Sequence, residues 1–186
     1  ASVHIDLNAF NTLQLAHLNN LNTFVPKAFF KEERLPDYLK YNIELQPDDY
    51  LVYDIIAGQD MVNVYLPFVN VNNYFIDYFG VFQYHHFSSI LLEKAFAEES
   101  NHQRQAIYLH IELDSIYLIA IKNNKLQLAN LFEYQSAEDI MYYLLSCAQS
   151  VGFKKDFVLK ISGETPGKAL EELLDRYVEN FQTTSI

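Results

Sequence analysis

The residues most suggestive of chemistry lie near the carboxyl end, between a short apolar strand and a helix. The segment Gly163-Glu-Thr-Pro-Gly-Lys168 is similar to a P-loop, whose backbone amides wrap phosphates while its lysine neutralises them. It is one residue too short, however, and Ala169 replaces the hydroxyl residue that would hold magnesium. Glu164 also places a negative charge within the loop that would surround the phosphates, and Pro166 removes one amide donor from it. We therefore interpret the segment as a strand-to-helix turn with Pro166 at the first helical position.

Histidine and cysteine form no predicted metal or nucleophilic site. His85 and His86 are adjacent on a predicted strand, so they point to opposite faces and cannot readily chelate one ion together. Cys147 is the only cysteine, which excludes an intramolecular disulfide, and its apolar neighbours predict a buried side chain. Ser88-Ser89 is interpreted as a helix start, and no G-x-S-x-G motif is present. The sequence predicts no catalytic residue and no metal ligand.

Composition narrows the functional classes further. The 186 residues include 13 Lys+Arg and 24 Asp+Glu, a formal net charge of −11, so nucleic-acid binding is not expected. No apolar run approaches the ~20 residues that span a bilayer. The first basic residue is Lys27, so we expect no signal peptide, and with the single cysteine this predicts a cytoplasmic location. Acidic pairs such as Glu98-Glu99 are interpreted as solvated surface.

The second half of the chain has the clearest strand pattern. Apolar and polar residues alternate over 107–113, which is typical of a strand, and residues 116–121 form a continuous apolar run. Asn123-Asn124 suits a tight hairpin turn because asparagine tolerates positive φ. A third strand is predicted over 126–132. These segments predict an antiparallel meander.

Two helices with a strand between them follow the meander. Ser136 and Asp139 form a capping-box pattern, apolar residues around Leu144 recur at helical spacing, and Gly152 is placed to end this helix. A strand is predicted over 157–161. The second helix should bury Leu170, Leu173, Leu174, Tyr177, Val178 and Phe181. The order β-β-β-α-β-α predicts a mixed sheet covered by helices, as in a ribonuclease-H-like unit.

The first half repeats part of this plan less clearly. We predict a helix over 8–21, then a strand from Asn22 and a helix ending near Tyr41. Further predicted elements are strands over 50–56 and 61–66 and helices over 70–79 and 88–99. Only residues 3–7 remain for the opening strands of this lobe, so the chain is expected to lack its natural N-terminus. The polar stretch around 98–105 gives a first lobe over 1–103 and a second over 104–186.

Three segments resemble the DUF3822 family of Bacteroidetes proteins. Residues 128–145 are similar to that family's N-x-F-x-Y-x-(S/T)-x-x-D-x-x-Y-Y stretch. Residues 23–30 resemble its F-T-L-V-P strand, and residues 82–86 resemble the segment before its central helix. The resemblance implies an α/β fold with mixed sheets of the actin-like ATPase type, with two ribonuclease-H-like lobes about a cleft. It implies no activity.

A more distant resemblance, to the actin-like pilus-assembly proteins of the PilM type, suggests where a nucleotide would bind. Their second lobe opens with two strands joined by a glycine-containing phosphate turn, which corresponds here to residues 109–118 and contains no glycine. Asp114 and Ser115 lie in this turn, and Ser162 and Gly163 lie where these proteins approach the adenosine. The turn at 114–115 and the loop at 162–163 should approach each other at one edge of the cleft. We expect Glu112, Asp114 and Glu164 to make that edge negative.

Two functions follow. The first is a non-catalytic interaction or scaffold module with a degenerate nucleotide site and no cofactor, which the 14 tyrosines favour because tyrosine is enriched at protein interfaces. The alternative is a switch or ATPase that binds Mg-ATP through Asp114, Ser115, Ser162 and Gly163, since magnesium could bridge the carboxylates and the phosphates. In either case we expect a protein partner or self-association, no nucleic acid and no insertion into a membrane.

Overall fold

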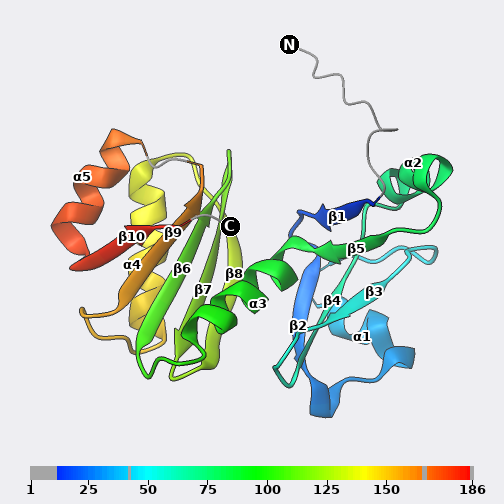
Figure 1. The fold of residues 1–186 in the computed structure, drawn as a ribbon, viewed down its shortest axis with the longest axis horizontal. Coiled ribbons are helices and arrows are strands. Elements are labelled where there is room, and N and C mark those ends of the chain that lie inside the picture. The colour runs from blue at the N-terminus through cyan, green and yellow to red at the C-terminus, as the bar shows by residue number, and fades with distance from the viewer. Residues whose placement is uncertain (1–11, 42, 165–166, 185–186) are drawn as a thin grey trace. The chain divides into compact units, whose positions relative to one another are not determined.

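The computed structural model describes residues 12–41, 43–164 and 167–184 and shows an α/β chain with three sheets (Figure 1). The chain divides into two units, Ala1–Ile90 and Leu91–Ile186. The division falls within helix α3 (Phe87–Glu99), ahead of the 103/104 boundary expected from the sequence. The polar stretch that suggested that boundary is therefore internal to the second unit.

The second unit contains a five-stranded mixed sheet with the order β10-β9-β6-β7-β8. Its strands are β6 (Gln105–Ile111), β7 (Ser115–Lys122), β8 (Lys125–Glu133), β9 (Val158–Gly163) and β10 (Asn180–Thr183). The first three form the predicted antiparallel meander, while β9 is parallel to both β6 and β10. The predicted order of strands and helices is confirmed, with β10 as an addition.

The turns of this sheet follow the side-chain chemistry that predicted them. Asn123 and Asn124 have φ of 50° and 58°, the left-handed conformation that asparagine tolerates, and they join β7 to β8. The prediction for the last helix was wrong at its end. Helix α5 (Lys168–Tyr177) stops before Phe181, which lies in β10. Tyr177, predicted to be buried, has an exposed side chain. Pro166, predicted to open this helix, lies outside the described residues.

Helices α4 (Ala137–Ser150) and α5 cover one face of this sheet (Figure 1). The predicted capping box starts α4: the Asp139 amide donates to Ser136 Oγ at 3.2 Å, and the Ser136 amide donates to Asp139 Oδ2 at 3.0 Å. Leu144 and Cys147 are buried against the sheet, as predicted, and burial raises the pKa of the Cys147 thiol to about 11.

The end of α3 is bound to the second unit's sheet through a charged network. The Arg104 guanidinium pairs with both carboxylate oxygens of Glu99 at 2.8 and 2.9 Å. The Tyr108 hydroxyl donates to Glu98 and Glu99, each at 3.0 Å, and Lys160 pairs with Glu98 at 2.5 Å. The expectation that Glu98-Glu99 is solvated surface was therefore wrong for Glu99, which is buried because it has a bidentate partner.

The first unit contains an antiparallel sheet, β2-β4-β3, with a short helix packed on it. Strands β2 (Asn22–Pro26), β3 (Val52–Ile55) and β4 (Met61–Tyr65) match the predicted segments, and α1 spans Leu35–Leu39. Two 3₁₀ turns lead from β2 into α1. The buried core of this sheet consists of Val25, Leu39, Val62 and Val64.

A second sheet of the first unit has two parallel strands, β1 (Gln14–His17) and β5 (Gln83–His86). Helix α2 (Val69–Phe79) precedes β5 and ends, as predicted, at Gly80, whose φ is +67°. The helix predicted over 8–21 was wrong: residues 14–17 are a strand, and residues 8–11 lie outside the described residues. A partner 69 positions along the chain, with Gln14 in register with Gln83, determines this conformation.

The first testable prediction concerns the core of the second unit. Leu144 is fully buried at the centre of α4, so Leu144→Ala should lower the free energy of unfolding by about 2–5 kcal/mol through lost contacts and a residual cavity. Leu145, its partly exposed neighbour, is the matched control, and Leu145→Ala should cost less than about 1 kcal/mol. Denaturant melts measure both, and equal losses would contradict the assigned helical face.

Candidate functional site

The candidate site predicted from the sequence lies at the ends of β6 and β9. These parallel neighbours place His110 beside Ser162 and Ile111 beside Gly163. The Glu164 amide continues the ladder by donating to the Ile111 carbonyl at 2.7 Å. The loop at 162–163 therefore lies next to the end of β6, from which the turn at 114–115 departs, so the expected approach of the two segments is found within this sheet.

The turn between β6 and β7 is held by Tyr134, which the sequence did not identify. The Glu112 amide donates to the Ser115 carbonyl at 2.9 Å, and this bond closes the turn. The Tyr134 amide donates to the Asp114 carbonyl at 3.1 Å, and its hydroxyl donates to the Glu112 carbonyl at 2.8 Å. The turn is thus fixed by its own backbone bond and by the amide and hydroxyl of Tyr134, which follows β8.

Gly163 is required because the backbone approaches too closely for a side chain. Its φ is +87°, and a Cβ at this position would lie 2.1 Å from the Ile111 carbonyl oxygen. The contact is with backbone atoms of the paired strand, which cannot move away as a flexible side chain would. The geometry therefore requires glycine at the junction of β6 and β9, and the adenosine-binding role suggested for Gly163 stays a prediction.

A hydrogen-bonded chain of Ser162, His110 and Glu112 crosses the ends of the two strands. His110 Nδ1 lies 3.0 Å from Ser162 Oγ, and His110 Nε2 lies 2.6 Å from Glu112 Oε1. An ionised carboxylate only accepts, so Nε2 donates to Glu112, and in the tautomer with its single proton on Nε2 the Nδ1 atom accepts from the Ser162 hydroxyl. Ser162 is 8% exposed and His110 is 5% exposed, so the chain joins the two strands from inside the unit.

A serine, a histidine and a carboxylate in this order also suggest nucleophilic catalysis. Catalysis would require the Ser162 hydroxyl to reach a substrate and a set of donors placed to stabilise an oxyanion. The Glu164 amide, next along this loop, donates to the Ile111 carbonyl. The printed contacts of Ser162, His110 and Glu112 hold the ends of the two strands together.

The electrostatic character of these loops is negative. Burial raises the pKa of the Tyr134 hydroxyl, and the carboxylates of Asp114, Glu164 and Glu112 raise it further because they oppose a second negative charge. Among the described residues no lysine or arginine forms an ion pair with any of the three carboxylates. The negative edge expected from the sequence is therefore present within the second unit.

The described part of the chain contains no group of three or more His, Cys, Asp or Glu side chains that could hold a metal ion. Lys168, the lysine of the P-loop-like segment, begins α5, and residues 165–166 of that segment lie outside the described residues. The roles proposed for Asp114, Ser115, Ser162 and Gly163 in binding Mg-ATP stay predictions.

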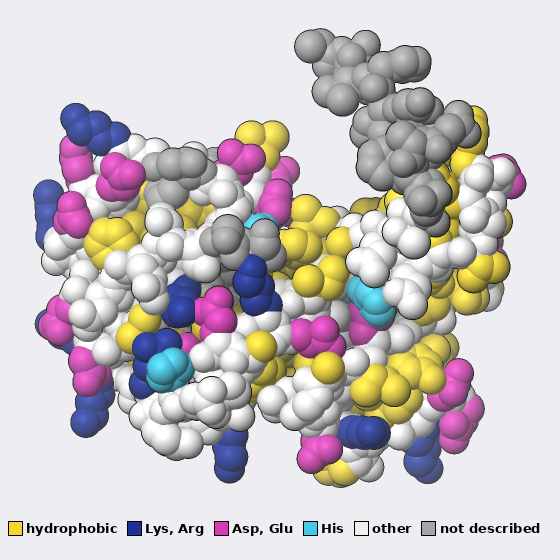
Figure 2. Space-filling model, in the orientation of Figure 1, with side chains coloured by type: hydrophobic (Ala, Val, Ile, Leu, Met, Phe, Trp, Pro, Cys, Tyr) yellow, Lys and Arg dark blue, Asp and Glu magenta, His cyan; other side chains and the backbone are white. Residues whose placement is uncertain are grey.

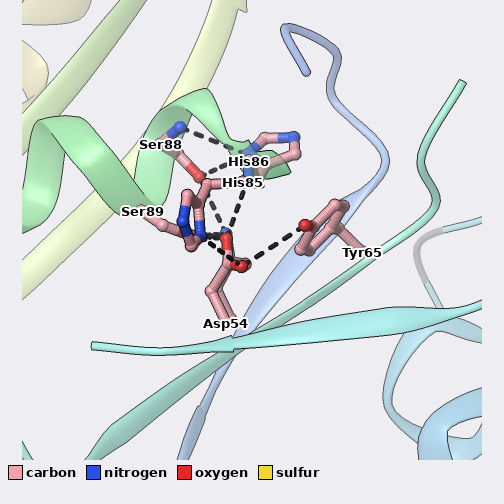
Figure 3. A network of polar contacts seen from close by, with 7 residues as sticks. Asp54, Tyr65, His85, His86, Ser88 and Ser89 are labelled. Carbon is pink, nitrogen blue, oxygen red and sulfur yellow. Dashed lines mark hydrogen bonds and ion pairs between the residues drawn. The ribbon is translucent and has the colours of Figure 1, made fainter. Parts of the chain in front are cut away.

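The first unit contains a second polar cluster, centred on Asp54 of β3 (Figure 3). The Asp54 carboxylate accepts from the Ser89 hydroxyl at 2.6 Å, the His86 amide at 2.8 Å and the Tyr65 hydroxyl at 3.3 Å. His85 Nδ1 lies 3.0 Å from Asp54 Oδ1, the oxygen that also accepts from Tyr65. Two acceptor oxygens thus bind four groups, which offsets the cost of burying the carboxylate and ties β3 to the start of α3.

His85 and His86 act separately, as their adjacent positions on a strand predicted. The His85 side chain is 52% exposed, whereas His86 is fully buried. Burial lowers the pKa of His86 to about 4, so this imidazole is neutral. The Ser88 amide donates to His86 Nδ1 at 3.2 Å, which leaves Nε2 to donate to Asn19 Oδ1, also at 3.2 Å.

Asn63 completes this cluster from β4. Its amide nitrogen donates to Ser88 Oγ at 3.1 Å and to Ser89 Oγ at 2.9 Å, and its oxygen accepts from Asn22 at 2.9 Å. The sequence identified Ser88-Ser89 as a helix start but missed Asp54 and Asn63. These two polar residues lie on apolar strands, and that is the only local signal that they need buried partners.

The sequence model of DUF3822, a family described as proteins of unknown function, matches residues 2–181. This chain belongs to the DUF3822 family. Among curated proteins none matches the chain.

Solved structures confirm the fold of this DUF3822 chain. It is similar, with a TM-score of 0.83 and 19% identity, to a Bacteroides thetaiotaomicron protein with an actin-like ATPase fold and unknown function. The match covers 93% of this chain and 68% of the other. The match to Archaeoglobus fulgidus Pelota has a TM-score of 0.30 and 11% identity, covers 68% of this chain and 35% of the other, and carries no argument. The predicted actin-like ATPase fold and α/β class are thus confirmed.

Within the described residues, no helix has both the length and the apolar character needed to cross a membrane.

Gly163→Ala tests the close approach of β6 and β9. The positive φ and the overlap with the Ile111 carbonyl should together lower the free energy of unfolding by about 2–3 kcal/mol. Gly167 is the matched control in the same loop, since its φ is −65° and a Cβ there meets nothing within 4 Å. Gly167→Ala should cost no more than about 1 kcal/mol in the same denaturant melts. If Gly163→Ala leaves the free energy of unfolding unchanged, the ends of β6 and β9 are farther apart than the structure shows.

The buried neutral His86 predicts a loss of stability in acid. Between pH 6.5, the ordinary histidine pKa, and about 4, the unfolded chain binds a proton at this position that the folded chain does not. The free energy of unfolding should therefore fall as pH decreases through this window, by about 2–3 kcal/mol at pH 4.5. Burial also lowers the pKa of His17, which acts in the same direction.

Denaturant melts across this pH range measure the effect. His86→Gln should reduce the slope of stability against pH, whereas His102→Gln, at an exposed position, should leave it unchanged. An equal slope in the wild type and His86→Gln would show that His86 is not the responsible group.

Proposed function

We propose that this DUF3822 chain is a non-catalytic protein-interaction module in which the nucleotide site of the actin-like fold is degenerate. The observation that carries the proposal is the charge of the loops after β6 and β9. Glu112, Asp114 and Glu164 gather around Tyr134 at the turn that corresponds to the phosphate turn of PilM-type proteins. An ATP-binding fold needs positive charge or free amides at this place.

Electrostatic repulsion supports the proposal. A carboxylate and a phosphate charge ~4 Å apart repel by about 1 kcal/mol in water and by about 4 kcal/mol near a protein surface with an effective dielectric constant of ~20. Three carboxylates act together here, and among the described residues no lysine or arginine forms an ion pair with any of them. Binding an unneutralised triphosphate would therefore be unfavourable.

The backbone bonding of the loops supports the same conclusion. A phosphate-binding loop presents backbone amides that have no other acceptor. Here the Glu112 amide donates to Ser115 and the Glu164 amide donates to Ile111, so both are used inside the sheet. A phosphate would have to displace these carbonyl acceptors before it could bind.

Exposed tyrosines support the interaction role. Tyrosine is enriched in the cores of protein interfaces because its ring is large and rigid and its hydroxyl can be solvated. In both units large aromatic side chains are exposed, including Tyr41, Tyr50, Tyr74, Tyr78, Tyr142 and Tyr177. Most of these rings lie outside the two polar clusters described above.

The alternative function is a switch or ATPase that binds Mg-ATP. Magnesium takes oxygen ligands and could bridge Asp114 and the Ser115 hydroxyl to the β- and γ-phosphates, which would turn the repulsion into attraction. Asp114 is exposed and Ser115 is half-buried, so both side chains can be reached from solvent. This alternative predicts that Mg-ATP raises the Tm, whereas a degenerate site predicts no change.

The proposal predicts no thermal stabilisation and no phosphate release with millimolar Mg-ATP. A ligand present at 100 times its Kd would stabilise the native state by ~2.7 kcal/mol and raise the Tm of a chain of this size by several degrees. The measurement is a melt with Mg-ATP, with Mg²⁺ alone as the control. A shift of several degrees that Asp114→Ala abolishes would contradict the degenerate site and support the magnesium-dependent alternative.

A further inference from the structure

The imidazole of His17 is buried at the end of β1 and binds the start of helix α2. His17 is 1% exposed, and its Cα partner on the neighbouring strand is His86. The Phe68 amide donates to His17 Nδ1 at 3.2 Å. Phe68 is the N-cap residue of α2, and its carbonyl accepts from the amides of Val71 and Asn72 at 3.0 and 3.1 Å. The residue that closes the first turn of α2 is therefore bound to His17 through its own amide.

A second contact joins the same imidazole to the helix. Within the described part of the chain Asn72 is the only buried residue of α2, and its side chain interacts with the His17 imidazole. The helix also has exposed aromatic and apolar side chains, among them Tyr74, Ile76 and Tyr78. Figure 2 shows hydrophobic side chains at the surface over α2. The one fully buried side chain of the helix therefore lies against His17.

The bond from Phe68 requires an unprotonated nitrogen on His17. A neutral imidazole has one ring nitrogen that accepts, and here Nδ1 accepts from an amide, so the ring proton is on Nε2. A protonated imidazole has an N–H on both nitrogens and accepts with neither. Its positive charge would also lie at the N-terminus of α2, where the helix dipole is positive and repels cations. Protonation therefore replaces an attraction between His17 and α2 by a repulsion.

The groups that face His17 from the neighbouring strands favour its neutral form on balance. Burial lowers the pKa of His17, and its contact with α2 and the Asp54 carboxylate of β3 offset this only in part. The rings of Tyr65 on β4 and Tyr84 on β5 have centroids 6.4 and 5.5 Å from the imidazole. Both hydroxyls stay uncharged because burial raises the pKa of each. A charged His17 would also repel a charged His86.

We propose that His17 is an acid-sensitive latch for helix α2. The neutral imidazole holds the start of the helix against β1, and uptake of one proton opens this contact while the rest of the first unit stays folded. The latch is closed above pH 6.5, the ordinary histidine pKa, because a released imidazole is then neutral as well. It opens as the pH falls below that value, since a released imidazole binds the proton that the closed one excludes.

The latch goes beyond the proposed function, because it involves neither the loops at 112–115 and 162–164 nor a nucleotide. It also differs from the loss of stability in acid that is assigned to His86. The ring nitrogens of His86 bind Ser88 and Asn19 rather than α2. Protonation of His86 should therefore destabilise the whole fold, whereas protonation of His17 should release α2 first.

Amide hydrogen exchange of the 186-residue chain, followed by NMR between about pH 7.5 and about pH 5, tests the latch. Dividing the intrinsic rate of each amide by its measured rate removes the direct effect of pH and gives a protection factor. For the Phe68, Val71 and Asn72 amides it should fall by at least about fivefold and at most about 30-fold, because one proton is bound. These protection factors should also stay below those of β4, as a local opening requires. Values equal to those of β4, or independent of pH, would overturn the proposal.

Two substitutions separate the latch from the other buried histidine. His17→Asn retains a side-chain oxygen that can accept from the Phe68 amide and does not titrate, so protection at the start of α2 should become independent of pH. His86→Gln, the matched control, should leave the pH dependence at α2 in place. A thermal melt of each variant verifies that it is folded, and the wild-type profile remains decisive if one is not. Loss of the pH dependence in His86→Gln, with retention in His17→Asn, would show that His17 is not the latch.

Discussion

The pairing of β6 with β9 is the interaction on which the second unit depends. β6 lies between an antiparallel neighbour, β7, and a parallel one, β9, and all but its first residue are buried. Polar side chains on such a strand need partners, because burying them without hydrogen bonds costs several kcal/mol. Tyr108 is therefore bound by Glu98 and Glu99, and His110 by Ser162 and Glu112. Of the acidic residues at the candidate site, Glu112 is therefore the one that bonds to a buried side chain of this strand.

The sequence predicts the second unit better than the first because local contacts dominate the meander and the capped helix. The alternation over 107–113, the turn at Asn123-Asn124 and the cap at Ser136 each involve residues a few positions apart. β1 was predicted as a helix because its partner, β5, lies far along the chain and its four residues have no clear alternation. β10 was missed for a similar reason: its residues are exposed, and only pairing with β9 defines it as a strand.

For the candidate site, the sequence located the loops but not the bonds that hold them. Asp114, Ser115, Ser162 and Gly163 were identified from the resemblance to PilM-type proteins, at the turns that follow two apolar strands. The contributions of His110 and Tyr134 depend on which strands become neighbours, and a single sequence does not specify this. Asp54 was missed in the same way, since it lies in an apolar strand and its partners Tyr65, His85, His86 and Ser89 come from three other segments.

The bonding of the loops bears on whether they could act as a switch. A nucleotide switch requires two arrangements that differ by a few kcal/mol, so that the ligand can select one of them. Moving the turn at 112–115 away from β8 would break the bonds from Tyr134 to Glu112 and Asp114, each worth about 1 kcal/mol net. Moving the loop after β9 would also separate Gly163 from the backbone against which it is packed, with no side chain to make new contacts. These contacts favour the observed arrangement of the loops, so a nucleotide could select another arrangement only by binding it more tightly by at least the free energy that these contacts supply.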